Sequence, residues 1–351
     1  MEPAPLSSLQ EKEGEPAGED SSSAFSAAAV PPRPATHSHS LHKYAPLDWS
    51  DYFDEERRVA IPGTDDVFNV YTAGSEGPVV FCLHGGGYSG LSFALAASRM
   101  KNKTRVVAMD LRGHGKSTTS DDLDLSIDTL TNDVIAVIRT MYGESPPAII
   151  LVGHSMGGSV AVHVAARKEI HNLHGLVVID VVEGTAMASL VHMQKILANR
   201  AQHFPSIEKA IEWSVKGGPL RNIDSARVSI PSTLKYNESQ GCYTYRTPLE
   251  ETEKYWKGWY EGLSDKFLSC PVQKILLLAG TDRLDRFVIS EFEKFSILLS
   301  MATVLGHKEG SYLDEEDVPE EFASHILNFI SRNKIGPNGV EIPGLVKKWG
   351  R

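Results

Sequence analysis

The sequence predicts an α/β protein with a mostly parallel, doubly wound sheet and a helical cap. Three observations lead to this fold class. Short apolar runs alternate with helical patterns along most of the chain, one run ends directly at a Gly-x-Ser-x-Gly motif, and a long helical stretch interrupts the alternation after it. Alternating strands and helices imply parallel strands that are joined by right-handed crossovers.

The predicted strands are continuous apolar runs, as expected for strands that are buried on both faces of a sheet. They comprise residues 78–83, 105–110, 147–152, 176–180 and 274–279, and an alternating segment at 67–71 adds a strand before them. Helical patterns lie between the runs. Ser126 is expected to cap a helix whose apolar face includes Leu130 and Val134, residues 158–167 form a second helix, and Asp317 is expected to cap the last one.

Composition divides the chain into a folded domain and two tails. Residues 1–45 are rich in Ser, Ala, Pro, Gly and Glu, which predicts a disordered tail because such a segment buries too little apolar surface. Residues 46–333 form the predicted domain, with the cap inserted at about 184–270, and residues 334–351 form a C-terminal tail. Packing is the main role expected for three aromatic residues of the cap, Trp213, Trp256 and Trp259, and a minority of them are expected to line a substrate groove.

Charge and cysteine content restrict the class of protein. The 351 residues carry a formal net charge of -10, which argues against a nucleic-acid-binding surface. The cysteines, Cys82, Cys242 and Cys270, indicate neither a disulfide framework nor a cysteine-rich zinc site. No signal-peptide pattern is present, and no apolar run approaches the roughly 20 residues that a membrane helix needs. We therefore expect a soluble protein of the cytoplasm, with the nucleus as a second location, and neither a membrane nor a nucleic acid as a partner.

Ser155 is the predicted nucleophile. It lies in Gly153-His154-Ser155-Met156-Gly157, directly between a buried strand and a helix. This context is typical of a nucleophile elbow, where the serine occupies a strained turn and the glycines two positions away avoid steric clashes. The glycine-rich segment His84-Gly85-Gly86-Gly87 follows an earlier strand. Backbone N–H groups near Gly86 and at Met156 are therefore expected to form an oxyanion hole.

A serine nucleophile needs a histidine base and a carboxylate that orients the histidine. Asp180 follows one predicted strand, and Asp282 and Asp285 follow the next, so spacing alone leaves the choice of acid open. His307 precedes the last helix and is the predicted base. Structural roles are expected for three further histidines, His114, His154 and His325. No cluster of His, Asp and Glu has the spacing of a metal site.

Together these residues resemble the protein phosphatase methylesterase family, which has the α/β-hydrolase fold. The resemblance covers about residues 46–286 and resumes from Glu316. It rests on the serine motif, on residues 179–187 and on cap segments such as 210–216 and 252–256. It implies a serine carboxylesterase that removes the methyl ester from the C-terminal leucine of its partner, the catalytic subunit of the type 2A protein phosphatase, and that needs no cofactor or metal.

The resemblance also implies roles for individual residues. It makes Ser155 the nucleophile and Asp180, rather than Asp282, the acid, and a Gly-His dipeptide before the last helix indicates His307. Residues 287–315 depart from the family, and His307 lies farther from Asp317 than the family's histidine lies from the matching aspartate. Two alternatives stay open: a small-molecule ester hydrolase and, because of this departure, a catalytically impaired phosphatase-binding protein.

Overall fold

A twisted sheet of eight strands forms the centre of the described molecule. The computed structural model describes residues 43–278, 302–304 and 315–341, with the backbone alone described for 302–304. The strand order is β1-β2-β4-β3-β5-β6-β9-β10. The strands are β1 (Glu55–Ala60), β2 (Val67–Ala73), β3 (Val79–Leu83), β4 (Arg105–Met109), β5 (Ile149–His154), β6 (Leu173–Ile179), β9 (Gln273–Leu278) and β10 (Ala302–Val304).

Strand direction agrees with the prediction. β1 and β2 are antiparallel to their neighbours, whereas the pairs from β4 through β10 are all parallel. The doubly wound α/β class is therefore confirmed, and the six strand segments predicted from the sequence match β2, β3, β4, β5, β6 and β9 within a few residues.

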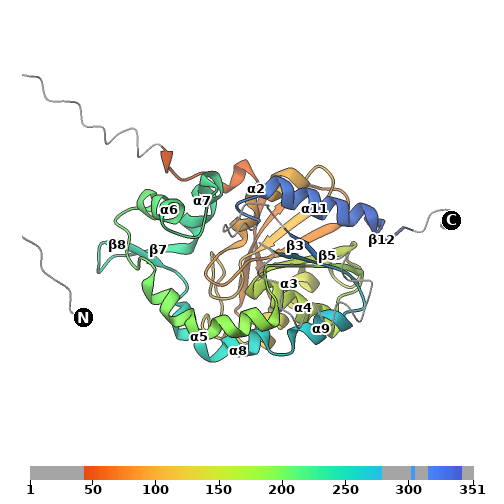
Figure 1. Ribbon diagram of the computed structural model, residues 1–351. Helices are drawn as coiled ribbons and strands as arrows, with labels where there is room; N and C mark the ends of the chain where they lie inside the picture. Colours follow the sequence, from red (N-terminus) through yellow and green to blue (C-terminus); the bar gives the residue numbers. More distant parts are fainter. Residues whose placement is uncertain (1–42, 279–301, 305–314, 342–351) are drawn as a thin grey trace, which may run out of the picture.

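Helices cover both faces of this sheet (Figure 1). One face carries α2 (Ala94–Met100) and α11 (Pro319–Arg332), and the other carries α3 (Ile127–Tyr142) and α4 (Met156–Arg167). Successive side chains of a strand point to opposite faces, so β5 contributes to both layers of the core. Ile149 and Leu151 pack in the cluster that contains α3 and α4, and Ile150 and Val152 pack in the cluster that contains α2 and α11. This double burial explains why the strands are continuously apolar in the sequence.

The cap is the segment between β6 and β9. Its elements are α5 (Glu183–Asn199), α6 (Ile207–Lys216), α7 (Ile223–Ser229), η3 (Ile230–Thr233), β7 (Leu234–Asn237), β8 (Cys242–Tyr245), η4 (Leu249–Thr252), α8 (Glu253–Tyr260) and α9 (Leu263–Ser269). Figure 1 shows α6, α7 and the β7–β8 hairpin on one side and α5 and α8 on the other. A separate apolar cluster around Ile211 and Leu220 also buries Tyr44, which lies in the range predicted as a tail.

Helix capping agrees with the sequence in one case and differs in another. Ser126 caps α3, since its side chain accepts a hydrogen bond from the Thr129 N–H, as predicted. The prediction for Asp317 is wrong, because Val318 occupies the N-cap position of α11. Oδ1 of Asp317 instead accepts hydrogen bonds from two backbone N–H groups just before α7, of Arg221 at 2.6 Å and Asn222 at 2.9 Å. These donors compete successfully for the carboxylate and join the start of the last helix to the cap.

Two further 3-10 helices and a short hairpin complete the described chain. They are η1 (Trp49–Asp51), η2 (Gly90–Phe93), and the strands β11 (Ile335–Gly336) and β12 (Gly339–Val340), which fall in the predicted C-terminal tail. Ile335 is buried, and the Pro337 carbonyl accepts a hydrogen bond from the Ala148 N–H just before β5. None of the helices in the described ranges has both the length and the apolar character of a bilayer-spanning segment.

Candidate active site

Ser155 lies at the sharp turn between β5 and α4. Its backbone angles are φ 49° and ψ -117°, a conformation that side-chain-bearing residues rarely adopt. A Cβ atom at Gly157 would lie 2.3 Å from the Leu83 carbonyl oxygen, and one at Gly153 would lie 2.2 Å from the Gly157 carbonyl oxygen. Both positions therefore require glycine. The strained turn places Ser155 at the carboxyl edge of the sheet, as the motif predicts for a nucleophile.

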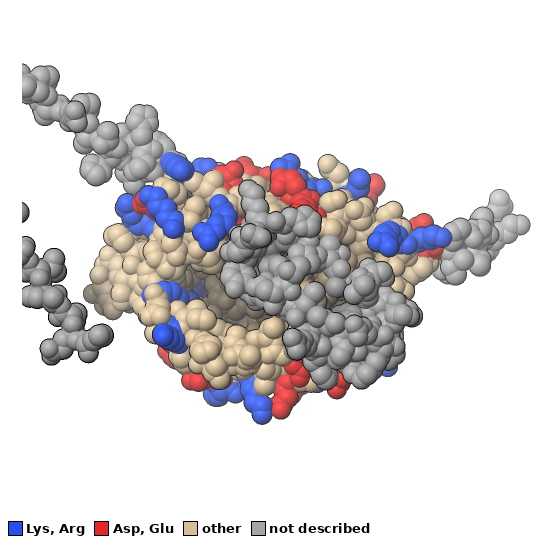
Figure 2. All heavy atoms as spheres, in the orientation of Figure 1, with Lys and Arg blue, Asp and Glu red and all other residues tan. Residues whose placement is uncertain are grey.

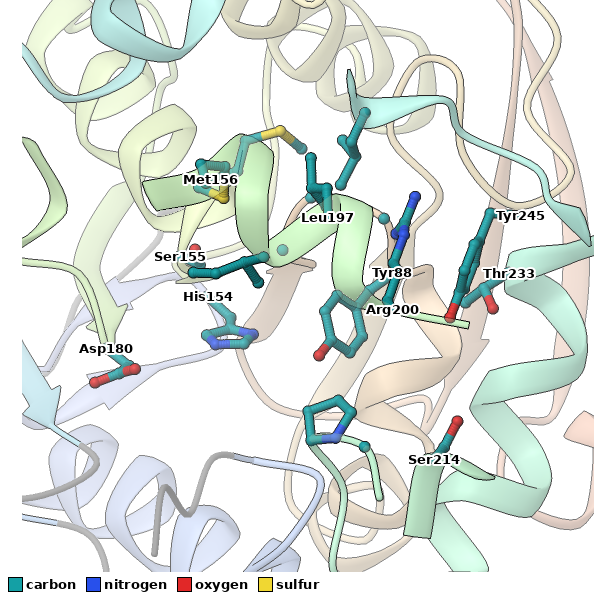
Figure 3. A pocket seen from close by; sticks show the side chains of 18 of the residues that line it. Tyr88, His154, Ser155, Met156, Asp180, Leu197, Arg200, Ser214, Thr233 and Tyr245 are labelled. Carbon is teal, nitrogen blue, oxygen red and sulfur yellow. The ribbon is translucent and has the colours of Figure 1, made fainter. Parts of the chain in front are cut away.

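Asp180 lies beside Ser155 at the end of the neighbouring strand. The Ser155 N–H donates to the Ile179 carbonyl at 3.0 Å, and the Asp180 N–H donates to the Leu277 carbonyl at 2.8 Å. Asp180 also has a positive φ of 50°, which turns the chain away from β6. Figure 3 shows the side chains of Ser155 and Asp180 on the same side of a common cavity. The predicted base and the alternative acids, His307, Asp282 and Asp285, lie outside the described residues.

The two predicted oxyanion residues line this cavity together. A Cβ atom at Gly86 would lie 3.7 Å from Sδ of Met156, so the glycine-rich loop passes close to the elbow. Met156 is the first residue of α4, and the first N–H groups of a helix have no partner within the helix. The loop and the helix terminus thus bring backbone donors to the region of Ser155, where an ester carbonyl oxygen would gain negative charge during attack.

Two buried histidines hold the glycine-rich loop. Nε2 of His114 accepts a hydrogen bond from the Gly87 N–H at 2.9 Å, and its Nδ1 lies 2.7 Å from the Arg112 carbonyl oxygen. His84 belongs to the loop itself, and its Nε2 accepts a hydrogen bond from the Leu111 N–H, in the turn after β4, at 3.0 Å. Both contacts require a neutral ring with the proton on Nδ1.

The pKa values of these two histidines agree with that arrangement. Burial lowers the pKa of His114 to about 4. Burial and the neighbouring His114 lower the pKa of His84 well below its ordinary value. His114 does not line the cavity, and its position in the turn after β4 fits the structural role expected for it.

His154 is held by a residue far along the chain as well as by its own turn. Its Nδ1 lies 3.2 Å from Oε1 of Glu315, whose side chain is only 1% exposed. The imidazole thus lies within salt-bridge distance of a buried carboxylate, which would form an ion pair with the protonated ring. The segment before α11 therefore reaches the nucleophile elbow. No sequence signal marks this contact, since Glu315 lies in a run of acidic residues that is typical of a solvated surface.

The cavity has a volume of about 770 Å³ and extends from the elbow into the cap. Figure 2 shows the surface hollowed between the part of the cap with α6 and α7 and the part with α5 and α8. Trp213, Trp256 and Trp259 all line the cavity. Trp256 and Trp259 are also packed in the core, and their indole N–H groups donate to the Thr252 hydroxyl and the Leu125 carbonyl. Packing and cavity lining are thus combined in the same side chains.

One cap residue reaches the nucleophile. Burial raises the pKa of Tyr260, and its proximity to the Ser155 side chain opposes this shift. Tyr260 is the last residue of α8, and its surroundings in the sequence show no motif that marks it. In the part of the chain that the structure describes, no three His, Cys, Asp or Glu side chains are grouped to hold a metal ion.

Comparison with known proteins identifies the class first. Residues 79–325 match the model of the alpha/beta hydrolase family, and the chain belongs to this family. Among solved structures, E-2-(acetamidomethylene)succinate hydrolase superposes with a TM-score of 0.64 at 21% identity, covering 79% of this chain and 99% of that one. An esterase of Mycobacterium tuberculosis gives a TM-score of 0.58 at 20% identity, covering 79% and 92%. These two similarities support the fold alone.

Curated relatives identify a narrower family. A probable protein phosphatase methylesterase 1 of Caenorhabditis elegans is 44% identical over 87% of this chain and 83% of its own length. Protein phosphatase methylesterase 1 of Homo sapiens is 40% identical over 83% and 86%, and that of Schizosaccharomyces pombe is 40% identical over 82% and 85%. The chain belongs to the protein phosphatase methylesterase family, which confirms the resemblance inferred from the serine motif and the cap.

Proposed function

We propose that this protein hydrolyses the methyl ester of the C-terminal leucine of the type 2A protein phosphatase catalytic subunit. The observation that carries the proposal is membership of the protein phosphatase methylesterase family, at 40–44% identity over more than four fifths of the chain. The hydrolase fold and the strained serine turn beside a cavity support an esterase. The same family membership disfavours a small-molecule ester hydrolase.

The proposed reaction begins with attack of the Ser155 hydroxyl on the ester carbonyl. His307 takes the serine proton and later passes it to the departing methanol, and Asp180 orients the imidazole. Backbone N–H groups near Gly86 and at Met156 stabilise the negative charge on the carbonyl oxygen. Water then attacks the acyl-enzyme, which releases the peptide carboxylate and restores Ser155. These steps need no cofactor.

Substitution of the nucleophile tests the proposal directly. Ser155→Ala should lower demethylation of the methylated phosphatase by at least about 10⁴-fold and abolish labelling by a fluorophosphonate probe. Ser189→Ala is the matched control, because Ser189 lies on the exposed side of α5 and its hydroxyl donates only to the Ala186 carbonyl among the described residues. Labelling of the Ser155→Ala variant would refute the role of Ser155.

The base is tested by a second pair of variants. His307→Asn should lower the demethylation rate by at least about 10³-fold, whereas His325→Asn should leave it unchanged. His325 lies in α11 and contacts Glu321 at 3.6 Å, away from the cavity-lining residues. Full activity of the His307→Asn variant would require another base. A wild-type protein that binds the phosphatase but takes up no probe would instead support the catalytically impaired binding protein.

A further inference from the structure

We propose that Arg200 selects substrates that carry an acidic side chain upstream of the esterified C-terminus. This inference rests on the proposed function and deepens it by naming a feature of the substrate. Arg200 directly follows α5 and lines the same cavity as Ser155. Figure 3 shows Ser155 and Asp180 on one side of that cavity and Arg200 beside Tyr245 on the other.

The charges of the cavity lining make Arg200 distinctive. Among the described residues that line the cavity, Arg200 is the only lysine or arginine and Asp180 is the only carboxylate. A methyl ester removes the negative charge of a peptide C-terminus, so the reacting end of the substrate needs no cation. Arg200 therefore suits an anion on another part of the peptide, and a cation fixed in a largely apolar cavity discriminates strongly between charged and neutral partners.

The guanidinium of Arg200 is held in place but keeps free donors. Its Cζ lies 3.9 Å from the ring centroid of Tyr245, which fixes the plane of the group. Its Nη2 lies 3.3 Å from Oε2 of Glu250. Its Nε is buried and has no hydrogen-bond partner in the described ranges. Because a guanidinium has five N–H donors, several remain for a carboxylate of the substrate.

Glu250 does not block that interaction. Its side chain is 46% exposed, against 16% for Arg200, and an ion pair with such an exposed partner contributes little free energy. A substrate carboxylate that meets the guanidinium in the less exposed cavity forms a stronger, charge-assisted contact. Replacement of the Glu250 carboxylate by a substrate carboxylate at the Arg200 guanidinium is therefore favourable.

A purely structural role for Arg200 has different consequences. A cation at the C-terminal end of α5 interacts favourably with the helix dipole, and the contact with Glu250 joins α5 to η4. Loss of these contacts would lower the stability of the cap. It would not make hydrolysis depend on the charge of the substrate, so charge dependence separates the two roles.

The test uses peptide methyl esters that end in leucine and carry one Asp or one Asn at successive upstream positions. For the wild-type protein we expect kcat/KM to be about 10-fold higher for Asp than for Asn at one position, mainly through KM, since a carboxylate forms a charge-assisted hydrogen bond with the guanidinium and an amide does not. Arg200→Gln should reduce this ratio to near one. Arg200→Lys should retain part of it, because lysine keeps the charge without the planar fork.

The matched control is Arg139→Gln, since Arg139 pairs with Glu169 at 3.0 Å on the surface and does not line the cavity. It should keep the full preference for Asp. Equal hydrolysis of Asp and Asn peptides at every position by the wild-type protein would overturn the inference, and so would a preference that survives in Arg200→Gln.

Failure of the proposed function would give a different result, in which no methyl ester peptide is hydrolysed. The inference is then decided by binding of the same peptides to Ser155→Ala, measured by fluorescence anisotropy. A tighter Kd for one Asp peptide that is lost in the Ser155→Ala, Arg200→Gln double variant supports it, and equal Kd values for all peptides overturn it.

Discussion

The two sides of the active-site cavity are built in different ways. On the sheet side, backbone geometry positions Ser155, through a strained turn and glycines that tolerate no side chain. On the cap side, α5 buries only Leu197, and Val191 and Ile196 are 78% and 59% exposed. At the end of α5, a side-chain contact with Tyr245 orients the Arg200 guanidinium.

This difference separates chemistry from selectivity. A turn that is fixed by backbone contacts has one accessible geometry, which suits a nucleophile that must be held within a fraction of an ångström. A surface of side chains can change one residue at a time without loss of the fold. We therefore expect substitutions near the elbow to affect stability and rate together, and substitutions in the cap to affect mainly stability of the cap or KM.

The largest effect is expected from a methyl group at the elbow. Gly157→Ala places Cβ 2.3 Å from the Leu83 carbonyl oxygen and should lower the free energy of unfolding by more than about 3 kcal/mol and abolish activity. Gly258→Ala is the matched control in cap helix α8, where no atom lies within 4 Å of the new Cβ. It should be neutral or stabilise by up to about 1 kcal/mol. Similar Tm values for the two variants in thermal denaturation would contradict the expected difference between the elbow and the cap.

Acid should destabilise the sheet side through His114. The unfolded chain binds a proton below about pH 6.5, whereas the folded protein does not until about pH 4, because burial lowers the pKa of His114. The contribution of His114 to the free energy of unfolding is therefore fully present above pH 6.5, and it falls by about 3 kcal/mol as the pH approaches 4. Nε2 of His114 now accepts a hydrogen bond from the Gly87 N–H. Protonation would place a hydrogen on Nε2, so this hydrogen bond would be lost and the two N–H groups would repel each other.

Urea denaturation at several pH values measures this effect. His114→Gln should be less stable than the wild type at neutral pH, and its stability should fall less steeply between about pH 6.5 and 4. His192→Gln, at an exposed position of α5, should follow the wild-type slope. An unchanged slope in His114→Gln would show that other groups control the acid transition.

The smallest effect is expected in the cap. The two carboxylate oxygens of Glu183 accept hydrogen bonds from the Gly262 N–H and the Ser264 N–H, both at 2.8 Å, which joins the start of α5 to the start of α9. Glu183→Ala should lower the free energy of unfolding by about 1–2 kcal/mol and raise KM without changing labelling of Ser155 by a fluorophosphonate. The exposed Glu144→Ala should have neither effect, and reduced labelling of Glu183→Ala would contradict the separation between the two sides.

The sequence by itself determined the sheet and the elbow. Strands buried on both faces must be continuously apolar, and a serine on a strained turn needs glycine two residues before and after it. Both requirements concern residues that are close together in the chain, so short segments such as 147–157 show them. They sufficed to predict the α/β class and the place of Ser155 at the end of β5.

Only the tertiary structure decided which distant side chains meet. Glu315 contacts His154, Asp317 accepts from the chain before α7 rather than capping α11, and Arg200 faces the cavity that Ser155 lines. These contacts join residues far apart in the chain, and each depends on how the cap and the last helix pack against the sheet. A pattern of neighbouring residues does not predict such packing. The elbow could therefore be predicted from the sequence, whereas the cap side of the cavity could not.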